Sequence, residues 1–184
     1  MRILVAITGA SGLEYGRRLV QVLKGRKDVE TSVVVSSGAR EVAKKEGAGI
    51  RLPEADYEEN DFSCPYASGS NPPDAMIVIP CSLKTLGEIS NGVGSNLINR
   101  AAEVCLKERK KLVLVVRETP YSLITIRNME TVTLAGAVVL PATPGFYGKP
   151  KKVDDLIDFI VARVLDQLGL KHNIGMRWSG KRKE

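Results

Sequence analysis

Residues 100–120, RAAEVCLKERKKLVLVVRETP, contain the features that decide the fold of this chain. The segment reads as the last turns of a helix, a tight turn and a short strand. Residues 111–116 (KLVLVV) are apolar and rich in β-branched side chains, which is typical of a strand covered on both faces. Residues 117–120 (RETP) follow at once. Ligands of parallel α/β sheets bind just beyond the carboxyl ends of strands, so Arg117 and Glu118 are either placed for chemistry or form a solvated loop with a chance ion pair.

Strands and helices alternate along the rest of the chain. This alternation predicts an α/β fold, with a three-layer, doubly wound, mostly parallel sheet of the Rossmann or flavodoxin-like kind in a single domain. The domain is expected to cover residues 1–178, followed by a basic C-terminal tail at 179–184. The predicted strands are 2–8, 29–35, 74–80, 111–116 and 136–141, and the predicted helices include 13–25, one ending near Glu46, and about 153–168.

The composition indicates a folded protein that is expected to be cytoplasmic. A length of 184 residues with 43% hydrophobic content suits one domain with a sizeable core. No apolar run approaches the roughly 20 residues that a membrane span needs. The segment MRILVAITGASG leads directly into a strand and a turn, without the pattern of a signal peptide.

The few metal-binding and nucleophilic side chains exclude several classes of chemistry. Cys64, Cys81 and Cys105 have no metal-ligand spacing and are expected to be reduced thiols. The single His172 argues against a zinc site and against Ser-His or Cys-His catalysis, so no metal is expected. The net charge of +6 is spread over predicted helices without a nucleic-acid-binding motif, and no nucleic-acid partner is expected.

Small polar or charged residues follow every predicted strand. Because carboxyl ends of parallel strands meet at one edge of the sheet, these residues predict a pocket rich in hydroxyls and backbone N–H groups, which suits a phosphorylated ligand. For TGASG (8–12), the alternative is an ordinary turn with Ser11 capping the next helix, and a cap is also the alternative for Ser82. The strand ends are Gly9–Gly12, Ser36, Cys81-Ser82, Arg117-Glu118 and Pro144–Tyr147.

Two charged patterns have a structural and a functional interpretation. Arg100, Glu103 and Lys107 share one stripe of a helix. They predict either a surface pair between Glu103 and Lys107 or a phosphate site made by Arg100 and Lys107. Residues 154–158 (DDLID) match a magnesium motif of isoprenyl diphosphate enzymes. We interpret them instead as acids in the first turn of a helix, where they complement the dipole.

Taken together, these segments resemble the flavin prenyltransferases of the UbiX family, and the resemblance implies that residues 1–178 are a flavoprotein domain. The family joins a dimethylallyl group to N5 and C6 of reduced FMN without a metal. The resemblance therefore implies FMN, dimethylallyl phosphate as substrate, a homo-oligomer of twelve subunits, and a UbiD-type decarboxylase that receives prenylated FMN as its cofactor. The shared motifs are ITGASG (7–12), SSGAREVAKKE (36–46), ASGS (67–70), PCSLKTL (80–86), residues 96–120, NM (128–129), LPATPGFYGKP (140–150) and DFIVARVLDQLG (158–169).

The resemblance also implies a role for each matched residue. Glu118 would move protons at the flavin and phosphate, Glu46 would act across a subunit interface, and Ser11 would assist them. Phe62 would pack on the prenyl group. The residues implied to bind FMN are Gly9, Ala10, Ser11, Ser36, Ser82, Leu83, Lys84, Thr85 and Arg117. Those implied to surround the prenyl phosphate, and to stabilise its departing charge, are Ser68, Arg100, Lys107, Arg117, Tyr147 and Arg163.

Two departures and two alternatives accompany the resemblance. Thr125 stands where many relatives have His, and residues 53–73 are shorter and more acidic than the family pattern. One alternative is an FMN-dependent decarboxylase of the related cysteine-decarboxylating flavoproteins, which use a His in the first helix region that is missing here. The other is a non-catalytic flavin carrier, which would need the FMN edge but not the basic residues of the phosphate site.

Overall fold

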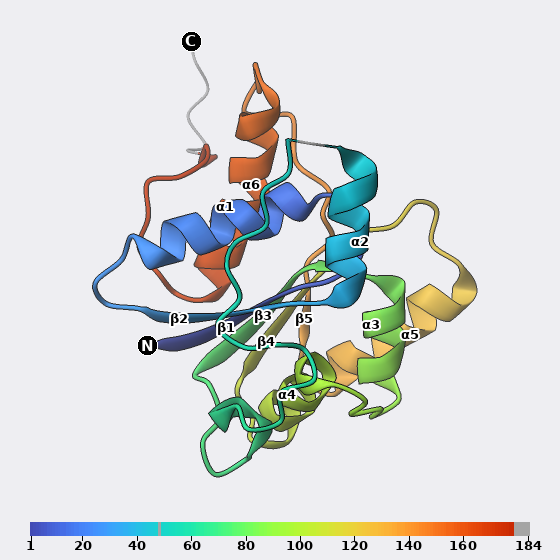
Figure 1. The fold of residues 1–184 in the computed structure, drawn as a ribbon. Helices are drawn as coiled ribbons and strands as arrows, with labels where there is room; N and C mark the ends of the chain where they lie inside the picture. Colours follow the sequence, from blue (N-terminus) through green and yellow to red (C-terminus); the bar gives the residue numbers. More distant parts are fainter. Residues whose placement is uncertain (48, 179–184) are drawn as a thin grey trace.

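The computed structural model describes residues 1–47 and 49–178, and the basic tail predicted at 179–184 lies outside them. In the described residues, parallel strands form one sheet in the order β2-β1-β3-β4-β5 (Figure 1). The predicted α/β, doubly wound architecture is confirmed, and every strand pair in the sheet is parallel. The strands are β1 (Arg2–Ile7), β2 (Glu30–Val35), β3 (Ala75–Cys81), β4 (Lys111–Val116) and β5 (Val138–Val139).

Helices cover both faces of this sheet and give the three layers. One face packs against α1 (Leu13–Lys24) and α6 (Val153–Gln167), and the other packs against α3, α4 and α5 (Figure 1). Helix α2 lies near the edge toward which β1 and β2 point. The remaining elements are α2 (Ser37–Glu46), the short 3₁₀ turn η1 (Pro65–Ala67), α3 (Leu83–Ser90), α4 (Leu97–Lys107) and α5 (Leu123–Leu134).

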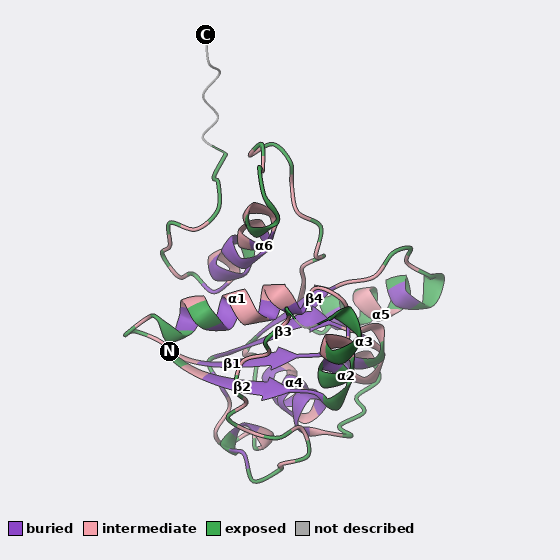
Figure 2. Cartoon of the chain, turned by 45° about the horizontal axis from the view of Figure 1, so that its top comes forward, coloured by how far each residue is buried: buried purple, intermediate pink, exposed green. Residues whose placement is uncertain are grey.

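The strands supply both cores because they are apolar on both sides. In β1, Ile3, Val5 and Ile7 join the core with α1 and α6, whereas Leu4 and Ala6 join the core with α3 and α4. Successive side chains of a strand point to opposite faces, so a continuously apolar strand belongs in the middle layer. Figure 2 shows the strands buried between the helices.

The fifth strand is shorter than the prediction of residues 136–141. Only Val138–Val139 have strand geometry. The chain nevertheless continues beside β4, since Leu140 N donates to Leu114 O at 2.9 Å and Ala142 N donates to Val116 O at 2.9 Å. Pro141 lies between these two donors and has no N–H of its own. Because successive N–H groups of a strand point to opposite sides, the N–H that Pro141 lacks would face the open side of this edge strand, and the segment stays paired with β4.

The acidic segment 53–73 covers the outer edge of β2. Tyr57 forms a parallel bridge with Val34, and Asp56 N donates to Val33 O at 2.8 Å. In return, Val33 N donates to the Asp56 carboxylate at 2.8 Å. An uncovered edge strand presents unpaired N–H and C=O groups. This segment satisfies part of that edge.

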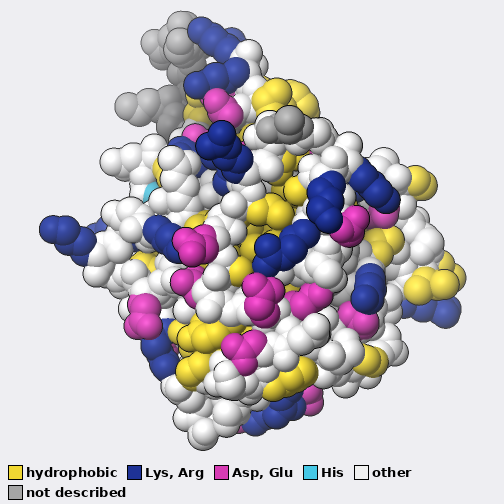
Figure 3. All heavy atoms as spheres, in the orientation of Figure 1, with side chains coloured by type: hydrophobic (Ala, Val, Ile, Leu, Met, Phe, Trp, Pro, Cys, Tyr) yellow, Lys and Arg dark blue, Asp and Glu magenta, His cyan; other side chains and the backbone are white. Residues whose placement is uncertain are grey.

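The surface carries mixed charge, and no described helix is both long and apolar enough to cross a membrane. On the face drawn in Figure 3, Lys and Arg side chains are interspersed with Asp and Glu. Exposed ion pairs include Arg40 with Glu58 at 3.3 Å and Lys44 with Glu41 at 2.8 Å. On this face the basic side chains therefore do not form one continuous patch, because acidic side chains lie between them.

The three cysteines are expected to react slowly in the folded protein. All are buried and free, and burial raises the pKa of the Cys81 and Cys105 thiols to about 12. At pH 7 a thiol with that pKa is deprotonated in only about one molecule in 10⁵. A disulfide reagent should therefore label the native protein only in trace amounts within minutes, and all three thiols after denaturation. Rapid labelling of native Cys81 or Cys105 would contradict the placement of these side chains.

Candidate functional site

Thr8 joins the carboxyl ends of β1 and β3. Its side chain is buried, its Oγ1 donates to Pro80 O at 2.8 Å, and the same atom accepts from Ser82 N at 2.8 Å. This one hydroxyl fixes the start of α3 against the loop after β1. The sequence reasoning did not single out Thr8, and the only available signal was a threonine directly before a glycine-containing turn.

Replacing Thr8 by Val should destabilise the protein while keeping its core volume. The variant loses a buried hydrogen bond and leaves Ser82 N without its acceptor, which together should cost about 1–3 kcal/mol of unfolding free energy. Urea denaturation followed by circular dichroism measures this loss. Thr8→Ser retains the hydroxyl and is the matched control. Equal stability of Thr8→Val and the wild type would show that the hydroxyl bridge contributes nothing.

The loop after β1 touches the start of α2 backbone to backbone. A Cβ atom on Gly9 would lie 2.8 Å from the carbonyl carbon of Gly38, so no side chain fits there. The N-cap of α1 is Gly12, and no side chain caps that helix, so the alternative of Ser11 as a helix cap is wrong. Ala10 is buried, and Ala10 N donates to Thr8 O at 2.8 Å. The loop therefore presents a close backbone surface and the Ser11 hydroxyl.

Ser36 and Ser82 both cap helices, and for Ser82 this was the structural alternative. Ser36 Oγ accepts from Ala39 N at 3.0 Å, and Ser82 Oγ accepts from Thr85 N at 3.2 Å. Leu83, Lys84 and Thr85 form the first turn of α3. A hydroxyl that accepts one bond still has a hydrogen to donate. The starts of α2 and α3 thus offer N–H groups, hydroxyls and positive dipole ends at one sheet edge, which is favourable for an anion.

Arg117 lies at this same edge, directly after β4. Its backbone N donates to Cys81 O at 3.3 Å, and its side-chain Nε is buried with no hydrogen-bond partner among the described residues. Burial raises the pKa of Tyr15, in α1, and the nearby Arg117 charge partly opposes that rise. An unpartnered buried N–H is costly. An acceptor supplied by a bound ligand would remove that cost.

Glu118 follows Arg117 and lies near Tyr121. Its Oε1 accepts from Thr119 N at 2.9 Å. Burial raises the pKa of Tyr121, and the Glu118 charge raises it further. Thr125 is buried in the next turn, where its hydroxyl lies 3.1 Å from that of the helix cap Ser122. Thr125 therefore contributes to the start of α5.

A second group of predicted residues lies over α4. Arg100 Nε donates to Ala67 O at 3.1 Å, next to Ser68, whose hydroxyl lies 2.8 Å from that of Ser70. Arg100 also pairs with Glu103 at 2.9 Å, and Lys107 pairs with Glu108. The predicted surface pair between Glu103 and Lys107 is therefore wrong, because Glu103 turns toward the preceding turn of the helix.

Lys107, at the end of α4, does not reach Arg117 within one chain. Lys107 ends α4 and precedes the amino end of β4, whereas Arg117 follows its carboxyl end. The six residues of β4 span roughly 20 Å at the usual rise of a strand. Glu46 ends α2 and is exposed, and Phe62 is 51% exposed in the loop that covers β2. Residues that the resemblance assigns to one site therefore lie apart in a single chain.

Tyr147 and Arg163 form a third group on the face covered by α6. Tyr147 packs edge-on against Phe159 and Trp178, with ring centroids 5.8 and 5.9 Å apart. Arg163 Nη1 donates to Asp166 at 2.7 Å. A cavity of about 580 Å³ lies beside Tyr147, between the loop 145–151 and the start of α6.

The acidic residues of 154–158 begin in the first turn of α6, where Asp154 and Asp155 lie, as predicted. Asp155 accepts from Lys151 N at 2.8 Å and from Lys152 N at 3.2 Å. The bond from Lys151 is the largest cause that holds the pKa of Asp155 below its usual value. Among the described residues, no group of three His, Cys, Asp or Glu side chains could hold a metal ion.

Known flavoproteins resemble this chain over most of its length. The Flavoprotein family profile matches residues 1–165. A flavin prenyltransferase UbiX of Methanocaldococcus jannaschii is 46% identical over 183 residues, covering 97% of this chain and 98% of the relative.

Two solved structures are similar over almost the whole chain. AnUbiX (PadA1), in complex with FMN and dimethylallyl pyrophosphate, is 46% identical with a TM-score of 0.91, covering 98% of both chains. A dodecameric FMN-dependent UbiX-like decarboxylase from Escherichia coli O157:H7 is 40% identical with a TM-score of 0.90, covering 98% of this chain and 100% of that one.

Proposed function

Because this chain belongs to the flavin prenyltransferases of the UbiX family, we propose that it transfers a dimethylallyl group from dimethylallyl phosphate to N5 and C6 of reduced FMN. It is a transferase acting on FMN. The structural observation that carries the proposal is Arg117, whose buried Nε has no hydrogen-bond partner among the described residues, at the edge where two helices begin. That edge offers the N–H and hydroxyl donors that a flavin phosphate requires.

The residues present fit FMN at this edge. The backbones of Gly9 and Gly38 pack directly against each other, so no side chain separates the loop after β1 from the start of α2. The hydroxyls of Ser11 and Ser36 can donate to a ligand, and so can that of Ser82 when the Thr85 hydroxyl donates to it. Arg117 supplies a fixed positive charge at the same place. We propose that these groups, with Ala10 and the first turn of α3, bind and orient the flavin.

A second set of donors would hold the prenyl phosphate. Breaking the allylic C–O bond leaves the electron pair on the phosphate, so cationic and hydroxyl donors stabilise the leaving group. These donors are proposed to be Ser68, Arg100, Lys107, Arg117, Tyr147 and Arg163. When bound, the reduced flavin supplies the two nucleophilic positions, N5 and C6.

Glu118 is proposed to move protons. The N5 and C6 positions each lose one proton, the prenyl alkene gains one, and the departing phosphate takes the other, so the net products are prenylated FMN and inorganic phosphate. A carboxylate beside both ligands is suited to such transfers. Glu118 lies directly after Arg117, which places it at the proposed flavin edge. Ser11 and Glu46 are proposed to assist.

The assembly is proposed to be a homo-oligomer of twelve subunits. One similar protein is described as a dodecamer. Lys107 and Arg117 lie at opposite ends of β4 in one chain, so a site containing both needs side chains from more than one copy. The product is proposed to serve as the cofactor of a UbiD-type decarboxylase.

Anaerobic incubation with reduced FMN and dimethylallyl phosphate tests the proposal. Mass spectrometry of the released flavin should show the gain of one C5 unit, and inorganic phosphate should appear in equal amount. Dimethylallyl diphosphate is tried in parallel as the donor. Unmodified FMN with both donors would refute the transferase. Release of CO₂ from a peptidyl cysteine would then favour the decarboxylase alternative, and flavin binding alone would favour the carrier.

A further inference from the structure

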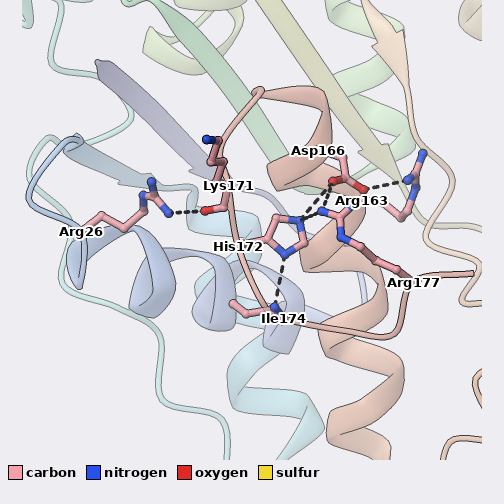
Figure 4. A network of polar contacts seen from close by, with 7 residues as sticks. All are labelled: Arg26, Arg163, Asp166, Lys171, His172, Ile174 and Arg177. Atoms are coloured by element: carbon pink, nitrogen blue, oxygen red, sulfur yellow. Dashed lines mark hydrogen bonds and ion pairs between the residues drawn. The ribbon is translucent and has the colours of Figure 1, made fainter. Parts of the chain in front are cut away.

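The chain after α6 folds back along that helix as a strap, residues 170–178. Leu170 N donates to Leu165 O at 3.1 Å, and Lys171 O accepts from Arg26 Nη1 at 2.8 Å (Figure 4). Gly175 adopts a φ of +68°, and a Cβ atom there would lie 3.0 Å from the Ala162 side chain. Contacts at residues 170–171 and at Gly175 therefore hold the strap against the rest of the chain.

His172 is the most deeply buried polar side chain of the strap, with a relative side-chain exposure of 3%. Its Nδ1 accepts from Ile174 N at 3.2 Å, which leaves the ring proton on Nε2. Nε2 lies 3.1 Å from Asp166 Oδ1 and donates to it, and it also lies 3.0 Å from Arg177 Nη2, a second donor to that oxygen. Nδ1 therefore binds within the strap, and Nε2 binds Asp166 of α6.

Asp166 receives three donors from two segments. Arg177 Nη2 donates to the same Oδ1 at 2.7 Å, and Arg163 Nη1 donates to Oδ2 at 2.7 Å (Figure 4). Burial opposes ionisation, but the hydrogen bonds from Arg177 and His172 hold the pKa of Asp166 below its usual value. Asp166 therefore remains a carboxylate that links the strap to Arg163.

The far end of the strap reaches Tyr147. A Cβ atom on Gly148 would lie 3.3 Å from Met176, and the Trp178 ring meets the Tyr147 ring edge-on. A cavity of about 280 Å³ lies at this place. Its lining includes Tyr147, Arg163, Asp166, His172, Arg177 and Trp178.

We propose that Asp166 is a positioning residue for Arg163 and that His172 latches the strap so that Trp178 supports Tyr147. The inference rests on the proposed function, in which Arg163 and Tyr147 bind the prenyl phosphate. Asp166 fixes one nitrogen of the Arg163 guanidinium and leaves its other nitrogens for a ligand. The strap thereby pre-organises both donors before the substrate arrives.

An ordinary helical ion pair would have a different character. An exposed i,i+3 pair contributes little, because solvent screens it and both side chains lose freedom. Here the carboxylate is also held by Arg177 and by the buried His172. The buried imidazole excludes water from one side of Asp166. Because this surrounding network holds the Asp166 carboxylate in place, Asp166 can position Arg163.

Steady-state kinetics of Asp166→Asn tests the positioning role. We expect the KM for dimethylallyl phosphate to rise roughly tenfold, with the KM for FMN and the kcat changed less than about twofold, because only the donor's phosphate loses an oriented partner. Glu41→Gln is the matched control, since Glu41 forms an exposed i,i+3 pair with Lys44 outside the proposed site. An unchanged donor KM in an active Asp166→Asn enzyme would overturn the inference and leave the proposed function intact. A wild type inactive with every donor would overturn both.

Trp178 tests the latch without any substrate, because it is the only tryptophan of the chain. Trp178 is 75% exposed and is held by its edge-on contact with Tyr147. His172→Leu should therefore lower the steady-state anisotropy of its fluorescence, whereas His172→Gln, whose amide can still donate to Asp166, should restore most of the wild-type value. Asn173→Ala is the control in the same strap. Equal anisotropy in His172→Leu, His172→Gln and the wild type would overturn the latch, and this comparison remains decisive where Asp166→Asn does not fold.

Discussion

Glu118→Gln is expected to retain FMN binding and to slow the formation of prenylated FMN by roughly 10²- to 10⁴-fold, the usual contribution of a positioned proton-transfer group. The glutamine keeps the size of the side chain and an oxygen that can accept from Thr119 N, as Glu118 does at 2.9 Å. It cannot take up a proton. Rapid mixing of the enzyme-bound reduced flavin with dimethylallyl phosphate, followed by mass spectrometry of quenched samples, measures the rate.

The control for this variant is Glu130→Gln, which removes an exposed carboxylate from α5. Flavin titration and thermal melting should match the wild type for both variants, because neither change removes a partner of the proposed flavin edge. Unchanged turnover in Glu118→Gln would exclude Glu118 from proton transfer. A loss of FMN binding equal to the loss of rate would instead assign it to ligand binding.

The fold was predictable because its strands are apolar in short runs and end in polar residues. The predicted bounds of β4 match the structure, since residues 111–116 have no competing helical period. β5 was overestimated because an apolar run does not reveal where regular strand geometry ends, although residues 140 and 142 still pair with β4. The capping role of Ser11 was wrong because the N-cap of α1 is Gly12, one residue later.

The candidate site was predictable only where it follows strand ends. The topology brings Ser36, Ser82 and Arg117 to one edge whatever the details of packing. Thr8 escaped prediction because its partners lie 72 and 74 positions away along the chain. The pairing of Glu103 with Arg100 instead of Lys107 depends on rotamers, which sequence spacing does not determine.

Mixed oligomers should reveal whether Lys107 and Glu118 of one site come from different chains. Lys107→Ala is expected to weaken binding of dimethylallyl phosphate more than that of FMN, because it removes a cation from the proposed phosphate donors and none from the flavin edge. Equal weakening of both ligands would contradict that assignment. Each variant alone should therefore be nearly inactive at low donor concentration, one through binding and the other through proton transfer.

Co-expression of Lys107→Ala and Glu118→Gln chains at equal levels should restore about a quarter of the wild-type activity, because random assembly makes about one site in four from two intact contributors. The distance along β4 supports this outcome, since it separates the two residues in one chain. Co-expression of the double variant with the wild type is the matched control. It should also give about a quarter if the residues come from different chains, but about a half if one chain supplies both. A half in the control, together with no restoration in the mixed variants, would show that each chain builds its own site and that Lys107 acts from a distance.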